Sequence, residues 1–392
     1  MIKISSFLLI SFISLVVFTS QIGMHSEVTP LFAGLGIFSF VLLNIILIII
    51  KQRMIIDIPY ISKFIYMLFF GLIFSSIFSY FITGRLKAII VYGALISLFF
   101  TTRIASKYIK NIDHFIINLA FGVCLAGVVI IILSLENKVF TMYRYKGFYT
   151  NANSMGMFAA GLIHMTVGVL YSYTNIERKK KLFFYSILSC SILFLLASNA
   201  RSALVSSLLV ILLIPLIEFC KSIEILNLKI YINYLKRFFN FLTLIALIFL
   251  IIYYLGLVDN TVDKFVTKSK AGDVSDGRLE SWIIQIQNWT WFGHENFDNI
   301  SKKKIIRGHS TWISHLNYYG FFAVSFFIIL LFYMFNWAWG VIRNNNNSNS
   351  AKLFFFILVG YAVNASFETS TSSPGLLISI ALFGILYKKK VS

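Results

Sequence analysis

Long apolar stretches alternate with short polar segments along almost the whole chain. Runs such as "IILIII" at 45–50 leave no period-two alternation of the kind that barrel strands need. A helix that crosses a bilayer takes about 20 predominantly apolar residues and satisfies its own backbone hydrogen bonds. The pattern predicts twelve such helices, at 4–22, 30–50, 64–83, 88–102, 114–134, 153–173, 182–198, 202–218, 239–257, 318–341, 352–367 and 374–388.

Composition supports the same class. The chain has 392 residues, of which 58% are hydrophobic and only 12% are charged. Soluble globular proteins average about 25% charged residues. We therefore predict an all-α polytopic membrane protein with about twelve transmembrane helices. The first stretch is interpreted as a retained helix, because no small-x-small cleavage site follows it.

The basic residues indicate how the helices are oriented. With a cytoplasmic N-terminus, the inside segments hold 20 Lys and Arg residues and the short outside loops hold six. This bias fits the positive-inside rule and predicts that both termini are cytoplasmic. The net charge of +19 then reflects topology and contact with anionic membrane lipid. No basic stripe with interleaved aromatic residues indicates nucleic-acid binding.

One large loop divides the chain into three predicted parts. These are transmembrane helices one to nine at 1–257, an outer loop at 258–317, and transmembrane helices ten to twelve at 318–392. Within the loop, Leu279, Trp282, Ile283, Ile286 and Trp289 fall on one helical face. The spacing predicts an amphipathic helix over 278–290 that lies at the membrane interface.

The predicted spans carry almost no charge. No Asp or Glu lies clearly inside one, and His164 is the most deeply placed titratable residue. Proton-coupled transport usually needs ionisable groups within the membrane, so this pattern disfavours a transporter. Cys124, Cys190 and Cys220 lie far apart with no metal or disulfide spacing, and they are interpreted as small apolar residues.

Four polar clusters fall on the predicted outer face. Each places at least one cation near a helix start, where free N–H groups and the helix dipole favour an anion. The clusters are "RYKGFYTNANSMG" at 144–156, "SNARSA" at 198–203, "SDGRLESW" at 275–282 and "IRGHSTWISHLNYYG" at 306–320.

Arginine suits phosphate because its planar guanidinium donates two parallel hydrogen bonds. Arg144, Arg201 and Arg278 could therefore converge on one phosphate or diphosphate at the membrane surface. The alternatives are that these cations contact lipid headgroups or solvent. The remaining candidates for substrate binding are Lys146, Asn151, Asn153 and Arg307, and for the two asparagines the alternative is a cap on the following helix.

His309 is the candidate base in the fourth cluster. An imidazole titrates near neutral pH and can accept a proton from an attacking hydroxyl. Ser310 and Thr311 beside it can cap the next helix, which is the alternative role of this segment. His294 and His315 are assigned no role.

The four clusters, in this order and topology, resemble the bacterial O-antigen ligase and O-antigen polymerase superfamily. "RYKGFYTNANSMG" is similar to the family's Arg-x-x-Gly-Phe-x-x-Asn-x-Asn pattern, and "SNARSA" to its Ser-x-x-Arg pattern. "DGRLESW" with "WFGHENF" resembles the Gly-Arg…Trp…Gly-x-Gly run, although His294 and Glu295 depart from it. "GHSTWISHLNYYGFFA" resembles the family's His-Asn…Gly pattern with Ser310 in place of Asn.

The resemblance implies a GT-C-like glycosyltransferase of the bacterial inner membrane that acts on its periplasmic face. Such enzymes take a glycan from undecaprenyl diphosphate without a metal or other cofactor. By the matched motifs, Arg201 and Arg278 would bind the diphosphate and His309 would orient or deprotonate the acceptor hydroxyl. Glu280, Glu295 and Glu368 rank below His309 as bases.

The resemblance leaves the acceptor open. A polymerase adds the growing chain to another lipid-linked repeat unit, and a chain-length regulator protein would be its partner. A ligase transfers the chain to lipid A–core. We favour the polymerase because the chain is rich in Ile, Lys, Phe and Asn, as such polymerases often are. A lipid-linked glycan flippase is the alternative of a different class, but it would not need a 60-residue outer loop.

Overall fold

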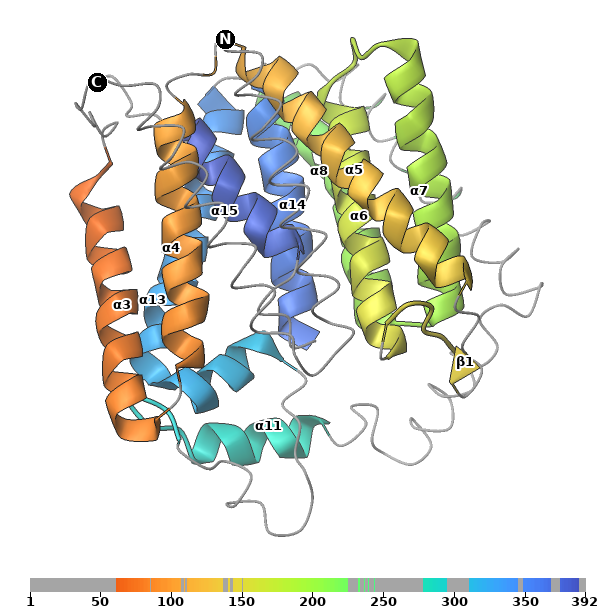
Figure 1. Cartoon of the computed structure of the whole chain (residues 1–392). Helices are drawn as coiled ribbons and strands as arrows, with labels where there is room; N and C mark the ends of the chain where they lie inside the picture. The colour runs from red at the N-terminus through yellow and green to blue at the C-terminus, as the bar shows by residue number, and fades with distance from the viewer. Residues whose placement is uncertain are drawn as a thin grey trace, which may run out of the picture.

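The computed structural model describes about three fifths of the chain, which forms a bundle of α-helices (Figure 1). The described residues are 61–84, 86–106, 109, 111–136, 140–141, 144–149, 151–224, 278–294, 310–344, 348–367 and 374–387, with single positions at 232, 236, 239 and 243. The helices are α3 (Lys63–Thr83), α4 (Lys87–Ala105), α5 (Ile112–Glu136), α6 (Ala152–Ser172), α7 (Arg178–Ser198), α8 (Arg201–Glu224), α11 (Arg278–Gln287), α13 (Thr311–Asn344), α14 (Asn349–Phe367) and α15 (Pro374–Leu386). A two-residue hairpin, β1 (Phe140–Thr141) and β2 (Arg144–Tyr145), connects α5 to α6.

Length and composition make this an α-helical, multi-pass membrane protein. Among the described residues, seven helices are long and apolar enough to cross a membrane, and α4 and α15 contain shorter apolar segments. These nine helices match nine predicted spans. The spans predicted at 4–22, 30–50 and 239–257 lie outside the described residues, so the number twelve stays a prediction.

Consecutive helices run antiparallel, as short connections require. In Figure 1 the lower end of the bundle therefore collects the starts of α4, α6, α8 and α13, and α11 lies across it. We call this the α11 end. The opposite end carries the basic cluster Arg178, Lys179, Lys180 and Lys181 at the start of α7.

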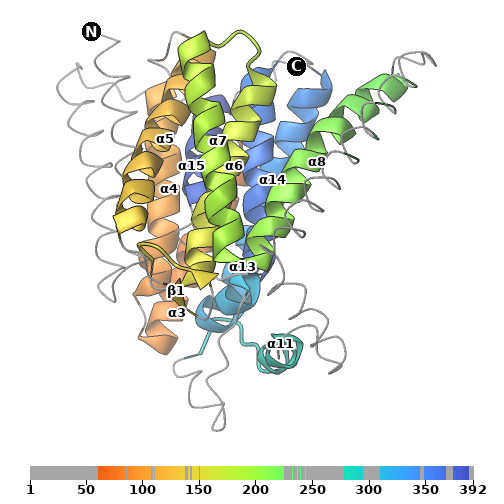
Figure 2. The ribbon, with the colours of Figure 1, turned by 90° about the vertical axis from the view of Figure 1, so that its right-hand side faces the viewer.

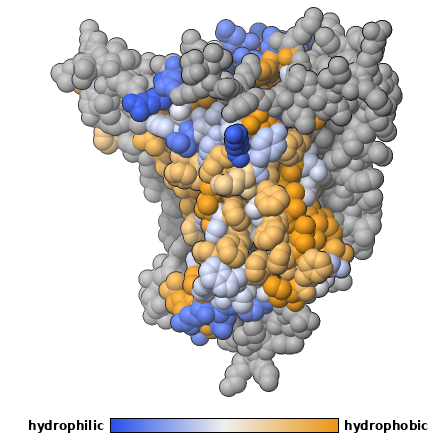
Figure 3. All heavy atoms as spheres, turned by 90° about the vertical axis from the view of Figure 1, so that its left-hand side faces the viewer, coloured by the Kyte–Doolittle hydropathy of each residue, from blue (hydrophilic) through white to orange (hydrophobic). Residues whose placement is uncertain are grey.

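The outer surface of the bundle is apolar, as contact with lipid requires. On α3 one face exposes Phe70, Phe74, Phe78 and Phe81, whereas the other buries small polar residues such as Ser76 against the bundle. Ser76 donates to the Leu72 carbonyl of its own helix, so its hydroxyl is satisfied without water. Figure 3 shows hydrophobic residues across the middle of this side and hydrophilic ones above and below.

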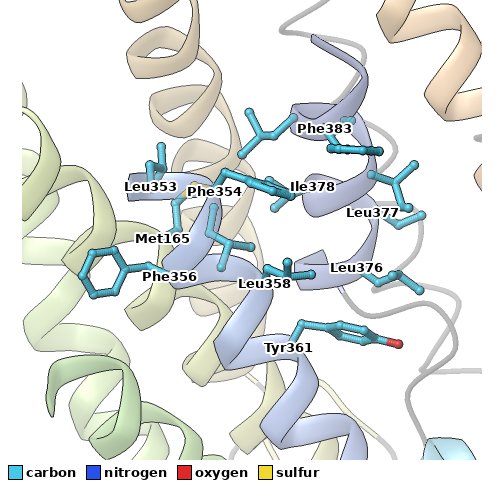
Figure 4. Close-up of a cluster of buried hydrophobic side chains, with 14 of the residues drawn as sticks. Met165, Leu353, Phe354, Phe356, Leu358, Tyr361, Leu376, Leu377, Ile378 and Phe383 are labelled. Carbon is cyan, nitrogen blue, oxygen red and sulfur yellow. The ribbon is translucent and has the colours of Figure 1, made fainter. Parts of the chain in front are cut away.

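The most buried helices lie in the middle of the bundle. Side chains of α14 interlock with those of α15, and the rings of Phe354 and Phe383 stack with centroids 6.1 Å apart (Figure 4). By contrast, α8 leans away from the bundle along its length (Figure 2). The centre of the molecule is therefore tightly packed around α14. The polar clusters described next lie at the α11 end of this packed region.

Candidate functional site

The first predicted cluster folds onto the ends of α5 and α6. Arg144 pairs with Thr141 in the hairpin, and Tyr145 donates a hydrogen bond to the Ser134 carbonyl at the end of α5. Burial raises the pKa of the Tyr145 and Tyr149 hydroxyls, so both remain neutral donors at physiological pH. The hairpin is thereby anchored, and Lys146 lies half-buried beside it.

Asn151 caps α6. Its Oδ1 accepts a hydrogen bond from the Ser154 N–H at 2.8 Å, which is the capping role that the sequence left as an alternative. Asn151 is exposed and Asn153 is half-buried in the first turn. The cap fixes where α6 begins, at the α11 end of the bundle.

The second cluster lies against the first. Asn199 ends α7 in the left-handed conformation (φ 51°), and α8 then begins at Arg201, which is half-buried. A Cβ on Gly156 of α6 would collide with the Cβ of Ala200. Because these two residues touch, the start of α8 is held beside the start of α6, and clusters that are 50 residues apart in sequence become neighbours.

Polar side chains then join α6, α8 and α14. Ser206 donates to Asn364 Oδ1 at 2.9 Å, and the imidazole of His164 occupies the space that a Cβ on Gly360 would need. His164 is 2% exposed, and its Nε2 has no hydrogen-bond partner among the described residues. We call this group the α6–α8–α14 junction.

The third cluster forms the predicted amphipathic helix. Sequence predicted it at 278–290, and α11 spans Arg278–Gln287. Leu279, Ile283 and Ile286 are exposed on its apolar face. Trp282 departs from the predicted stripe, because its indole nitrogen is buried. It lies one turn before the buried Gln285, on the face of α11 that meets α13.

The fourth cluster is the first segment of α13. The sequence predicted a span from residue 318, but α13 begins at Thr311 and contains non-helical backbone at Gly320. Between these points Ser314, His315 and Asn317 are all buried. The helix start expected at Ser310 and Thr311 is observed, whereas the burial of these three polar side chains was not predicted. In Figure 1 it turns across the bundle near α11.

Three side-chain contacts hold this segment in place. His315 Nδ1 is hydrogen-bonded to the Tyr92 hydroxyl of α4 at 2.8 Å. Asn317 donates to Gln285 of α11 at 2.8 Å, and the Trp312 indole donates to Ser366 of α14 at 3.1 Å. The partners in these contacts belong to the helices α4, α11 and α14.

No role was predicted for His315 or Tyr92 from the sequence. The only signal that could have found His315 is its position five residues before a glycine in a polar segment that leads into an apolar helix. Tyr92 lies in an apolar run, where nothing in the pattern distinguishes its hydroxyl as a hydrogen-bonding group. Their pairing is a long-range contact that local spacing does not encode.

The structure brings the candidate residues together in two groups. Arg201 joins Asn151 and Asn153 where α6 and α8 begin, and α11, which starts at Arg278, joins the first segment of α13. His309 and Arg307 lie outside the described residues, as do the side chains of Arg144 and Arg278. Their convergence on one phosphate stays a prediction.

The start of a helix is a place where an anion can bind. Both α6 and α8 begin at the α11 end, and Arg201 is the first residue of α8. Among the described residues, no three His, Cys, Asp or Glu side chains come together as a metal site. No protein-family model matches the chain, and neither does any curated protein.

Proposed function

We propose that this protein is a polymerase that joins undecaprenyl-diphosphate-linked oligosaccharide repeat units on the periplasmic face of a bacterial inner membrane. The observation that carries the proposal is the gathering of the polar clusters at the α11 end. Sequence separates them by up to about 160 residues, yet α6, α8, α11 and α13 all begin there. Antiparallel order alone would bring these helix starts to one end. The proposal is supported by what they carry, namely Arg201 at the first position of α8 and the buried Ser314, His315 and Asn317 in the first segment of α13.

The chemistry follows from the residues at these helix starts. Glycosyl transfer from a lipid diphosphate needs the leaving diphosphate to be stabilised as its charge develops. Arg201 and Arg278, each the first residue of a helix, would supply fixed positive charge to it. His309 would take the proton of the acceptor hydroxyl. The arginines would thereby do what a divalent ion does in other transferases.

Gene deletion followed by gel analysis of the surface polysaccharide tests the proposal. Loss of the polymer ladder with a single repeat unit left on the core is the expected result. Bare core with polymer retained on the lipid carrier would instead identify the ligase, which shares this chemistry. Repeat units trapped on the cytoplasmic face would identify the flippase.

Complementation with single variants then tests the site. We expect Arg201→Ala to lower polymer formation by about 100- to 1,000-fold, the effect of losing one preorganised donor. Arg178→Ala is the matched control, since Arg178 also begins a helix but at the opposite end of the bundle. Equal ladders from both variants would contradict the assignment of the site to the α11 end.

Two further measurements address orientation and metal. A reporter fused after residue 270 should report an outside location, and a cytoplasmic signal would reverse the proposed topology. Chelation by EDTA should leave polymer formation in isolated membranes unchanged. A strict requirement for Mg²⁺ or Mn²⁺ would contradict the role given to the arginines.

A further inference from the structure

The backbone of α13 breaks at Gly320, and the loop that follows α11 fills the break. Phe321 N–H donates to the Thr290 carbonyl at 2.9 Å, and Phe322 N–H donates to the Trp291 carbonyl at 3.3 Å. On the other side, the His294 N–H donates to the Asn317 carbonyl at 2.9 Å. A broken helix leaves backbone groups without intrahelical partners. Here the main chain of residues 290–294 supplies those partners.

Two glycines make this approach possible. Gly293 and Gly320 have φ of 96° and 86°, a region that favours glycine. A Cβ at Gly293 would lie 2.6 Å from the Tyr318 carbonyl oxygen, and one at Gly320 would collide with the main chain of Trp291 and Phe292. The two segments therefore lie backbone against backbone, at a separation that no side chain permits.

The same loop fixes α11. In the described part of the chain α11 packs chiefly on α13, through the buried pair Gln285 and Asn317. The Phe292 ring packs on Phe78 of α3 with centroids 5.3 Å apart. If the break opened, α11 would lose its main support, whereas the packing of α6, α14 and α15 would remain.

We propose that Gly293 and Gly320 are positioning residues for the transfer reaction. They let the loop 290–294 close the α13 break, and the closed break holds the start of α11, at Arg278, in a fixed place relative to the first segment of α13. This inference rests on the proposed function. It adds to that function by assigning the geometry of the site to main-chain contacts that Gly293 and Gly320 permit.

Alanine variants at four glycines test the inference. Gly293→Ala and Gly320→Ala should each lower polymer formation, per amount of protein, by about 10- to 100-fold, because displacing a reacting group by about 1 Å has effects of that size. Gly161→Ala and Gly340→Ala are matched controls, since a Cβ at either position has no neighbour within 4 Å. The assay uses membranes of the deletion strain, which contain unextended lipid-linked repeat units.

A reversible cross-link separates positioning from a general folding defect. Thr290→Cys with Phe321→Cys places two thiols on residues whose main chains are joined by a hydrogen bond of 2.9 Å. Mass spectrometry of the digested protein should find the linked peptides after oxidation. In the Gly293→Ala background, oxidation should restore a large part of polymer formation, and dithiothreitol should remove it again.

The outcomes are distinct. Wild-type polymer formation by both glycine variants, or activity that does not respond to a cross-link that has formed, would overturn the positioning role. Unchanged polysaccharide in the deletion strain would overturn the proposed function and this role with it. The linked peptides would still report whether the loop closes the break, because their detection needs no glycan.

Discussion

The α6–α8–α14 junction and the α13 break both bury polar groups between helices, but they are built differently. At the junction, three continuous helices meet through side chains. Ser206 donates a hydrogen bond to Asn364, and the His164 imidazole packs against Gly360. At the break, one helix is interrupted and main chain meets main chain at Gly293 and Gly320. A side-chain contact can be repaired by changing its partner, whereas a main-chain contact cannot.

The largest effect is expected at the break. Gly320 lies at φ 86° and ψ 171°, a backbone region essentially confined to glycine. Gly320→Ala therefore combines backbone strain of about 1–3 kcal/mol with overpacking of about 1–3 kcal/mol. The free energy needed to detach α11 should fall by about 2–6 kcal/mol. Amide hydrogen exchange should show faster exchange in α11 and in residues 290–294, with little change in α14 and α15.

A second-site change sharpens this prediction. The atoms that a Cβ at Gly320 meets belong to the backbone of Trp291 and Phe292, so Phe292→Ala should not slow exchange in the Gly320→Ala protein. Gly340→Ala, farther along α13, is the control and should exchange like the wild type. Recovery through Phe292→Ala would show that the contact is made by a side chain after all.

The second prediction concerns the junction. Gly360→Ala places a methyl group against the His164 imidazole and should destabilise the protein by about 1–3 kcal/mol through overpacking. Thermal unfolding in detergent measures the change. Adding His164→Ala removes the ring that this methyl group meets. The double variant should therefore lose less unfolding free energy than the two single losses added together, by about 0.5–3 kcal/mol. Strict additivity would contradict the contact.

These two regions also show what the sequence could predict. The apolar runs located nine described helices within a few residues, because burial in lipid imposes one composition on every span. The amphipathic spacing likewise located α11. The span predicted from residue 318 begins next to the break at Gly320, and α13 starts at Thr311, beside the expected cap. The burial of Ser314, His315 and Asn317 was not predictable, because it depends on partners distant in sequence.

The candidate site was predictable in part. Cations before apolar runs indicated helix starts, and Arg201 and Arg278 do begin helices. The partners of His315 and Asn317 were not predictable, since Tyr92 and Gln285 are 223 and 32 residues away. Hydrophobic spacing describes each helix by itself, and it contains no information on which polar side chain meets which.

The third prediction tests the pair beneath the first segment of α13. Tyr92→Phe removes the hydroxyl bonded to His315 and leaves Nδ1 buried, which should cost about 1–3 kcal/mol. Tyr92→Phe with His315→Phe removes both polar groups and should recover part of that loss in thermal unfolding. A double variant as unstable as the sum of both single variants would show that the two side chains act separately.

The smallest effect is expected from one hydroxyl at the junction. Ser206 and Ser207 are adjacent and both buried, but only Ser206 donates across helices, to Asn364, and the Ser207 hydroxyl has no hydrogen-bond partner among the described residues. Ser206→Ala should lower the unfolding free energy by about 0.6 kcal/mol, a typical interhelical hydrogen bond in a membrane protein. Ser207→Ala should leave it unchanged or raise it slightly. Equal losses from the two variants would mean that packing, and not the bond to Asn364, holds α8 on α14.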